Sequence, residues 1–183
     1  ILSLADLGTI GIAKQRHMKK RWRFPTKRQI ELDVLGSADD PLLCPNHMAD
    51  LHQVIVDDVC QVGDPMKEDT NIGPITRKDL AEKVRSQVTK TIAQGAKAIT
   101  NLSSISAESN FVSPTILTDV TPTMCAFQEE IFGPVWTVIK ANSTEHAIEL
   151  ANNTVYGLGA SIWTADEKAG EELAPQLQSG NVF

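Results

Sequence analysis

Two adjacent carboxylates, Glu129 and Glu130, stand directly ahead of Phe132, a Gly-Pro pair and an apolar run in the stretch QEEIFGPVWTVIKA, residues 128–141. Ionised carboxylates accept hydrogen bonds, so this pair could make a polar contact to a ligand at the mouth of a sheet. The alternative is an exposed acidic turn with Phe132 in the core. The residues alone leave both interpretations open.

Cysteine and histidine are the other residue types here that could do nucleophilic or metal chemistry. The three cysteines, Cys44, Cys60 and Cys125, form no Cys-x-x-Cys pair, and their odd number argues against a disulfide framework. This pattern indicates a reducing, intracellular compartment. His47 and His52 lie near Cys44 and could suggest zinc, but the spacing is not that of a metal site, so we expect no metal.

The composition is that of a soluble globular protein, with 42% hydrophobic and 22% charged residues in 183. No apolar run approaches the roughly 18 residues that span a bilayer, and no signal peptide is visible, so we expect a cytoplasmic protein without a membrane partner. Residues 14–28 hold eight of the 17 Lys and Arg, although the net charge is −6. A nucleic-acid patch is one interpretation. The acidic remainder would repel a polyanion, so we favour a solvated face and no nucleic-acid partner.

Hydrophobic periodicity predicts the elements that must position these residues. A helix is expected over residues 78–94, with a capping box at Thr76 and Asp79 and with Gly95 at its end. Its apolar stripe recurs every four residues, at Leu80, Val84, Val88 and Ile92.

Further helices are expected over residues 143–152 and 165–178, the second with a capping box at Thr164 and Glu167 and a kink or end at Pro175. Short strands are expected within residues 111–120, 134–141, 156–164 and 180–183. This alternation predicts an α/β fold with a largely parallel sheet and flanking helices.

Several motifs together resemble the NAD(P)-dependent aldehyde dehydrogenases. They are VGDPMKEDTNIGPI, FVSPTILTDV, QEEIFGPV, AIELANNTVYGLGASIWTAD and LQSGNVF, and the resemblance runs from about Val62 to Phe183. It implies part of the aldehyde dehydrogenase fold, oxidation of an aldehyde to a carboxylic acid with NAD or NADP, and a homo-oligomer. The helix at 78–94 looks most like bacterial members of the succinate-semialdehyde type.

The resemblance also implies roles for particular residues. Glu130 would lie at the nicotinamide ribose and Phe132 would border the nicotinamide ring, as cofactor-binding residues. Glu31, in a stretch that resembles the family's LELGGSDP with inserted residues, would be the catalytic general base. Residues 1–48 would be a disturbed remnant of the cofactor-binding region, with a glycine turn and helix at GTIGIAKQ. Residues 49–183 would be the catalytic-domain-like portion, incomplete at its C-terminus.

The family's nucleophilic cysteine lies in a loop between the LELGG-like stretch and the GDP motif, and no such loop stands between Glu31 and Gly63. Cys44 and Cys60 have the wrong setting, and Cys125 looks structural. We therefore expect no aldehyde oxidation by this chain alone. The alternative function is a non-catalytic binding or scaffold fragment of the family.

Overall fold

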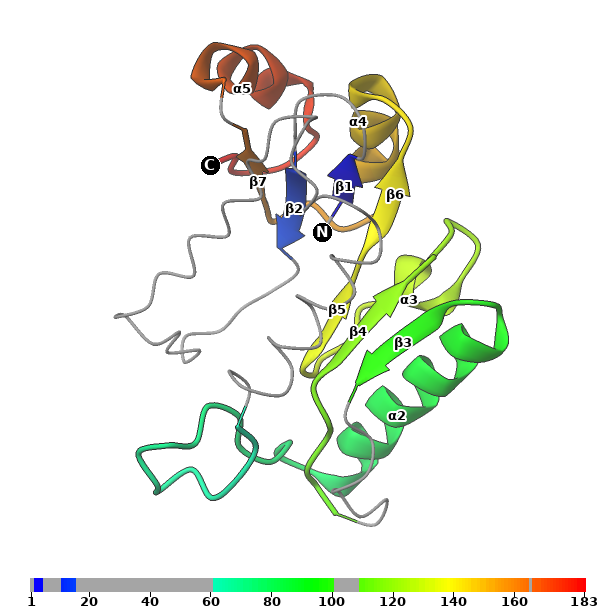
Figure 1. Ribbon diagram of the computed structural model, residues 1–183, viewed down its shortest axis with the longest axis vertical. Coiled ribbons are helices and arrows are strands. Elements are labelled where there is room, and N and C mark those ends of the chain that lie inside the picture. The colour runs from blue at the N-terminus through cyan, green and yellow to red at the C-terminus, as the bar shows by residue number, and fades with distance from the viewer. Residues whose placement is uncertain (1, 5–10, 16–60, 101–108, 165) are drawn as a thin grey trace, which may run out of the picture. The chain divides into compact units, whose positions relative to one another are not determined.

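The computed structural model describes residues 2–4, 11–15, 61–100, 109–164 and 166–183 (Figure 1). The predictions for Glu31, Cys44 and Cys60 lie outside these ranges, as do most of the basic run and the domain boundary at residue 48. The described residues sort into two units. One comprises residues 61–100 and 109–137, and the other comprises the two N-terminal strands with Val138–Phe183.

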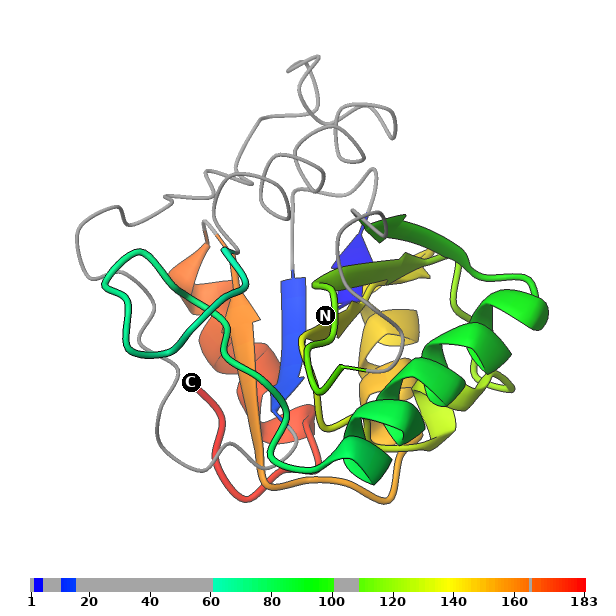
Figure 2. The ribbon, with the colours of Figure 1, turned by 90° about the horizontal axis from the view of Figure 1, so that it is seen from below.

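The first unit combines two helices with a three-stranded sheet. Strand β4 is central, antiparallel to β3 and parallel to β5. Figure 1 and Figure 2 show the long helix α2 beside the short helix α3. In chain order the elements are α2 (Lys78–Ala93), β3 (Lys97–Thr100), β4 (Thr115–Thr118), α3 (Cys125–Gln128) and β5 (Val135–Thr137).

The second unit contains a four-stranded sheet in the order β6-β1-β2-β7. After β7 the chain returns to it, because the Ala160 amide donates to Asn181 O at 2.8 Å and the Phe183 amide donates to Ala160 O at 3.0 Å. In chain order the elements are β1 (Leu2–Leu4), β2 (Gly11–Gln15), β6 (Ile139–Ala141), α4 (Thr144–Asn152), β7 (Gly159–Trp163), α5 (Glu167–Leu173) and the 3-10 helix η3 (Ala174–Gln176).

The α/β arrangement is confirmed, but the strand pairing is more mixed than expected. Among the described strands, β1 with β6 and β4 with β5 are parallel, whereas β1 with β2, β2 with β7 and β3 with β4 are antiparallel. The glycine turn and helix expected at GTIGIAKQ is wrong over its second half, where Gly11–Gln15 is strand β2. The expected strand PVWTVIKA is divided between β5 and β6, which belong to different sheets.

The helix expected at 78–94 is confirmed as α2, but its buried face is not the apolar stripe. Leu80 and Ile92 are 39% and 40% exposed, and only Val84 of the stripe is fully buried. Helix α2 instead buries Ala81, Val84, Gln87 and Thr91. Polar side chains occupy this face because they bind α3 and the chain that follows it.

The predicted cap of α2 is also wrong. Arg77 is the N-cap residue and its side chain makes no capping bond. The Asp79 carboxylate pairs with the Arg77 guanidinium instead, with Nε to Oδ1 at 2.9 Å. At the other end, Gly95 has a φ of 113°, the conformation expected of a glycine that ends a helix.

Helices α4 and α5 agree with the sequence predictions in place, and each begins at a side-chain cap. Ser143 Oγ accepts from the His146 amide at 3.1 Å and caps α4. Asp166, rather than the expected Thr164, caps α5 by accepting from the Ala169 amide at 3.1 Å. Pro175 lies in η3, where the α-helix has ended.

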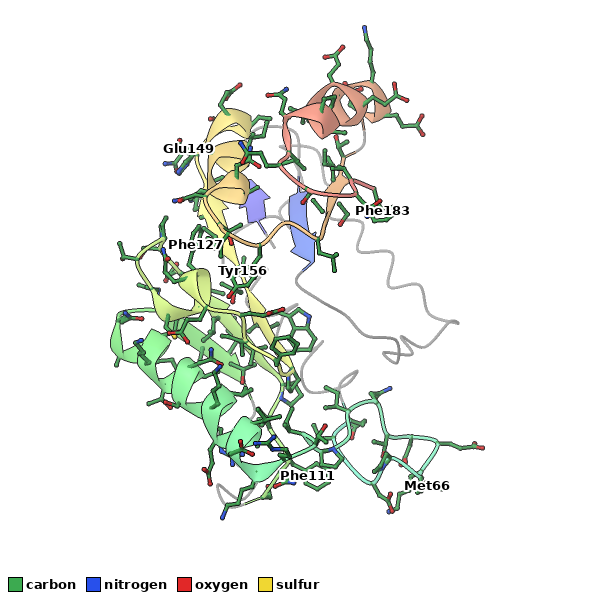
Figure 3. All side chains as sticks on the ribbon, turned by 180° about the vertical axis from the view of Figure 1, so that it is seen from behind. Met66, Phe111, Phe127, Glu149, Tyr156 and Phe183 are labelled. Carbon is green, nitrogen blue, oxygen red and sulfur yellow. The ribbon has the colours of Figure 1, made fainter. Side chains whose placement is uncertain are left out.

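Leu117 of β4, Val84 and Thr91 are the largest side chains buried completely among the described residues. In contrast, Met66 is 88% exposed and projects from the loop between residues 61 and 75 (Figure 3). No helix in the described part of the chain is long and apolar enough to cross a membrane.

Candidate functional site

The candidate site is the chain between α3 and β5, residues 129–134, which we call the 129–134 segment. Both of its ends are fixed by backbone hydrogen bonds. The Glu129 amide donates to Cys125 O at 2.8 Å, which ends α3, and the Thr115 amide of β4 donates to Pro134 O at 2.9 Å. The segment is therefore held at a helix end and at the start of a parallel strand pair.

The first of the two adjacent carboxylates is bound by α2. Gln87 Nε2 donates to Glu129 Oε2 at 3.0 Å, and Lys90 Nζ lies 3.4 Å from Glu129 Oε1. The pKa of the Glu129 carboxyl is lowered, chiefly by the Gln87 hydrogen bond and then by the Cys125 thiol and the Lys90 ammonium, against the effect of partial burial. The Glu129 carboxylate is thus bound by side chains of the protein itself.

The second carboxylate has a different environment. The backbone carbonyl of Glu130 accepts from Gln87 Nε2 at 3.2 Å, whereas no described residue pairs with its carboxylate, which is partly exposed. Phe132, two residues on, is 61% exposed. The alternative that placed Phe132 in the core is therefore wrong. A free carboxylate and an open aromatic ring are brought together on one short segment.

The remaining residues of the segment face the protein interior. Ile131 packs against the buried cluster formed by Ala81, Val84 and Val112. Gly133 lies so close to α2 that a Cβ atom there would be 2.8 Å from Val84 Cγ1. Ile131 and Gly133 thus anchor the segment, whereas Glu130 is partly exposed and Phe132 is largely exposed.

Helix α2 also supplies the hydrogen-bond acceptors for the start of α3, which has no side-chain cap of its own. The Cys125 amide donates to Gln94 Oε1 at 2.8 Å, and the Ala126 amide donates to Thr91 Oγ1 at 3.1 Å. The Thr91 hydroxyl in turn donates to Gln87 O at 2.7 Å. These bonds satisfy amides that a helix leaves unpaired at its first turn, and they fix the helix from which the 129–134 segment departs.

Cys125 is the one cysteine within the described residues, and its environment is that of a structural thiol. The side chain is 3% exposed. Burial raises the pKa of the thiol, and the hydrogen bond and negative charge of Glu129 raise it further, against the smaller effects of Lys90 and Thr91. A nucleophilic cysteine needs the opposite shift, so Cys125 does not fit that role.

The lowered pKa of Glu129 gives a testable pH dependence. Because the folded-state pKa lies below the unfolded value, the stabilisation is present above the ordinary pKa of about 4.3 and is lost as the pH falls through the lowered value. We expect the ¹³C resonance of the Glu129 carboxyl to titrate with a lower midpoint than those of exposed glutamates. The variant Gln87→Met should move that midpoint upward. An unchanged midpoint would show that Gln87 does not determine the pKa.

The structure brings together two of the three residues that the sequence singled out, Glu130 and Phe132, and Glu31 lies outside the described residues. The sequence patterns did not single out Gln87, Thr91 and Gln94 of α2. A signal was available, since Gln87 and Thr91 are four residues apart and share a helical face with Val84. A face that carries both polar and apolar residues can be a buried one when it packs against backbone.

The fold and the site define an α/β protein in which a carboxylate that no described residue pairs with and an exposed aromatic side chain stand ahead of a parallel strand. The aldehyde dehydrogenase family model matches residues 46–183. The chain belongs to the aldehyde dehydrogenase family.

Relatives of known function agree with this assignment. The succinate semialdehyde dehydrogenase [NAD(P)+] Sad of Escherichia coli is 43% identical over 123 residues, which cover 67% of this chain and 27% of the relative. The succinate-semialdehyde dehydrogenase [NADP(+)] of Deinococcus radiodurans is 36% identical over 121 residues, 66% of this chain and 25% of the relative. The matches therefore cover about a quarter of the length of these relatives.

Solved structures give the same result. The succinic semialdehyde dehydrogenase from Streptococcus pyogenes, in complex with NADP+, superimposes with a TM-score of 0.69 at 29% identity, over 75% of this chain and 30% of that one. An aldehyde dehydrogenase from Mycobacterium tuberculosis, complexed with NAD+, gives a TM-score of 0.67 at 31% identity, over 75% of this chain and 28% of that one.

Proposed function

We propose that the 129–134 segment binds the nicotinamide ribose of NAD+ or NADP+ within an aldehyde dehydrogenase. The observation that carries the proposal is the difference between the two adjacent carboxylates. Glu129 is held by Gln87 and Lys90, whereas the Glu130 carboxylate has no partner among the described residues. A segment fixed by its neighbours that still presents a free carboxylate is arranged to receive a ligand.

The chemistry of the segment fits this cofactor. A carboxylate has enough acceptor sites to receive hydrogen bonds from both hydroxyls of a ribose, and the exposed Phe132 ring can contact a flat heteroaromatic ring. When bound, the nicotinamide supplies the hydride acceptor for aldehyde oxidation. The protein's part is to hold the ribose and orient the ring. Relatives whose names specify NAD(P)+ or NADP(+) support the choice of cofactor.

Thiol chemistry is not part of the function that we propose for this chain. The reaction class needs a cysteine thiolate, and Cys125 is buried with a raised pKa. We infer that the chain contributes cofactor contacts and does not turn over aldehydes by itself. Succinate semialdehyde is the substrate class that the names of the Escherichia coli and Deinococcus radiodurans relatives suggest. On the basis of the family resemblance, we also propose a homo-oligomeric state and a cytoplasmic location.

The two adjacent glutamates provide a matched test by calorimetric titration with NAD+ and NADP+. The variant Glu130→Gln should weaken binding by roughly ten-fold or more, because a hydrogen bond to a charged group contributes about 1.5–3 kcal/mol. The variant Glu129→Gln should stay close to the parent chain, because an amide oxygen there still accepts from Gln87. Equal losses in the two variants, or none in either, would contradict the proposal.

A further inference from the structure

Gln87 is a buried polar residue that the proposed function does not use directly. Its side chain is 5% exposed, on the face of α2 that meets the 129–134 segment. The amide nitrogen donates to two acceptors at once, Glu129 Oε2 at 3.0 Å and Glu130 O at 3.2 Å. Both protons of the amide are therefore used on two consecutive residues.

The orientation of this amide follows from its partners. A reversed amide would place its oxygen against a carboxylate and a carbonyl, which both accept hydrogen bonds. The observed orientation leaves Gln87 Oε1 buried without a hydrogen-bond partner among the described residues. A buried oxygen without a donor is destabilising, so this residue is not the choice that maximises stability at its position.

We propose that Gln87 is a positioning residue for cofactor binding, which fixes the backbone of Glu130 so that the Glu130 carboxylate and the Phe132 ring face the nicotinamide ribose. The inference rests on the function proposed above. Gln87 acts through the segment and not on the cofactor, because its amide protons are already used within the protein. Its bond to the Glu130 carbonyl is the one that restrains the residue carrying the free carboxylate.

The variant Gln87→Met removes both hydrogen bonds at nearly constant volume. Because one hydrogen bond contributes about 1 kcal/mol net, we expect the Kd for NAD+ or NADP+ to rise about five-fold. The effect should be coupled to Glu130, so that Gln87→Met weakens binding much less when Glu130→Gln is already present. The exposed helix residue Ser86 gives a control, since Ser86→Ala should leave binding unchanged.

An exchange of the two side chains separates positioning from stability. In Gln87→Glu/Glu129→Gln the bond between residues 87 and 129 is kept with donor and acceptor reversed. A carboxylate at position 87 cannot donate to the Glu130 carbonyl. We expect the exchange variant to regain the stability lost in Gln87→Glu while cofactor binding stays about five-fold weaker than in the parent chain. Parental affinity in the exchange variant would overturn the inference.

Fluorine NMR gives a readout that does not need the cofactor. The chain has five phenylalanines, and with 4-fluorophenylalanine the Phe132 signal is assigned by its loss in Phe132→Leu. Gln87→Met should shift or broaden that signal and leave the buried Phe127 signal unchanged. If the parent chain binds neither cofactor, the proposed function fails, and the Phe132 signal still decides whether Gln87 fixes the segment. If the parent binds and Gln87→Met binds equally well, the positioning role is wrong and the function stands.

Discussion

No reduced cofactor is expected when this 183-residue chain is mixed with NAD+ or NADP+ and a panel of aldehydes that includes succinate semialdehyde. The reaction class begins with attack by a thiolate, and loss of a catalytic nucleophile costs up to roughly 10⁶-fold in rate. Cys125 is 3% exposed, its thiol pKa is raised, and its backbone amide is bound by Gln94. A buried thiol with a raised pKa is poorly suited to present a thiolate to a ligand. Absorbance of the reduced nicotinamide at high protein concentration measures the outcome.

The control for this experiment is substitution of each cysteine in turn. Cys125→Ala, Cys44→Ala and Cys60→Ala should all behave like the parent chain, with no turnover to lose. If the parent oxidises an aldehyde and one of these substitutions abolishes the activity, then that cysteine is the nucleophile. The prediction that this chain lacks the family's thiol chemistry would then be wrong.

Replacing Gly133 by alanine should destabilise the 61–137 unit by about 1–3 kcal/mol, the usual cost of overpacking a core. The added Cβ would lie 2.8 Å from Val84 Cγ1 and 3.1 Å from Val84 Cγ2. Val84 is 2% exposed and packs with Ala81 and Val112, so it has little room to move away. Hydrogen exchange at the buried amides of α2 measures the loss. Cofactor affinity should fall too, because the segment can no longer pack on α2.

Gly73 is a matched control in the same unit. A Cβ atom at Gly73 would lie 3.5 Å from the Cβ of Pro65, which is an ordinary contact. Gly73→Ala should therefore change the free energy of unfolding by less than about 0.5 kcal/mol. Equal effects at the two glycines would show that the close approach of Gly133 to Val84 is not what holds the segment.

The sequence predicted elements better than it predicted which faces they bury. The four-residue repeat of Leu80, Val84, Val88 and Ile92 located α2 correctly, because any helix brings such residues onto one side. The repeat did not identify which part of the protein packs against that side of the helix. The surface that α2 contacts includes the start of α3, whose amides need acceptors, and residues 129 and 130, whose oxygens accept hydrogen bonds. Thr91 and Gln87 are therefore buried beside Val84. Periodicity alone carries no information about unpaired amides on a neighbouring element.

The residue types of the candidate site were predictable, but the residue types alone did not predict how the two carboxylates divide their roles. Glu129 and Glu130 are identical in type and adjacent in sequence, so only the family resemblance singled out Glu130, and no residue pattern identified the partners of Glu129. The division of roles depends on Gln87 and Lys90, about forty residues earlier in the chain. The caps show the same limit, since Asp79 pairs with Arg77 where the sequence predicted a capping box with Thr76.

The most direct test of the account uses the two halves of the cofactor as separate probes. Nicotinamide mononucleotide and adenosine monophosphate are each titrated into isotope-labelled chain, and the amide resonances of residues 129–133 are followed. We expect nicotinamide mononucleotide to shift the Glu130 and Phe132 resonances in the parent chain but not in Glu130→Gln, and adenosine monophosphate to leave them unchanged. Shifts by adenosine monophosphate alone, or nicotinamide mononucleotide shifts that persist in Glu130→Gln, would contradict the assignment of Glu130 to the nicotinamide ribose.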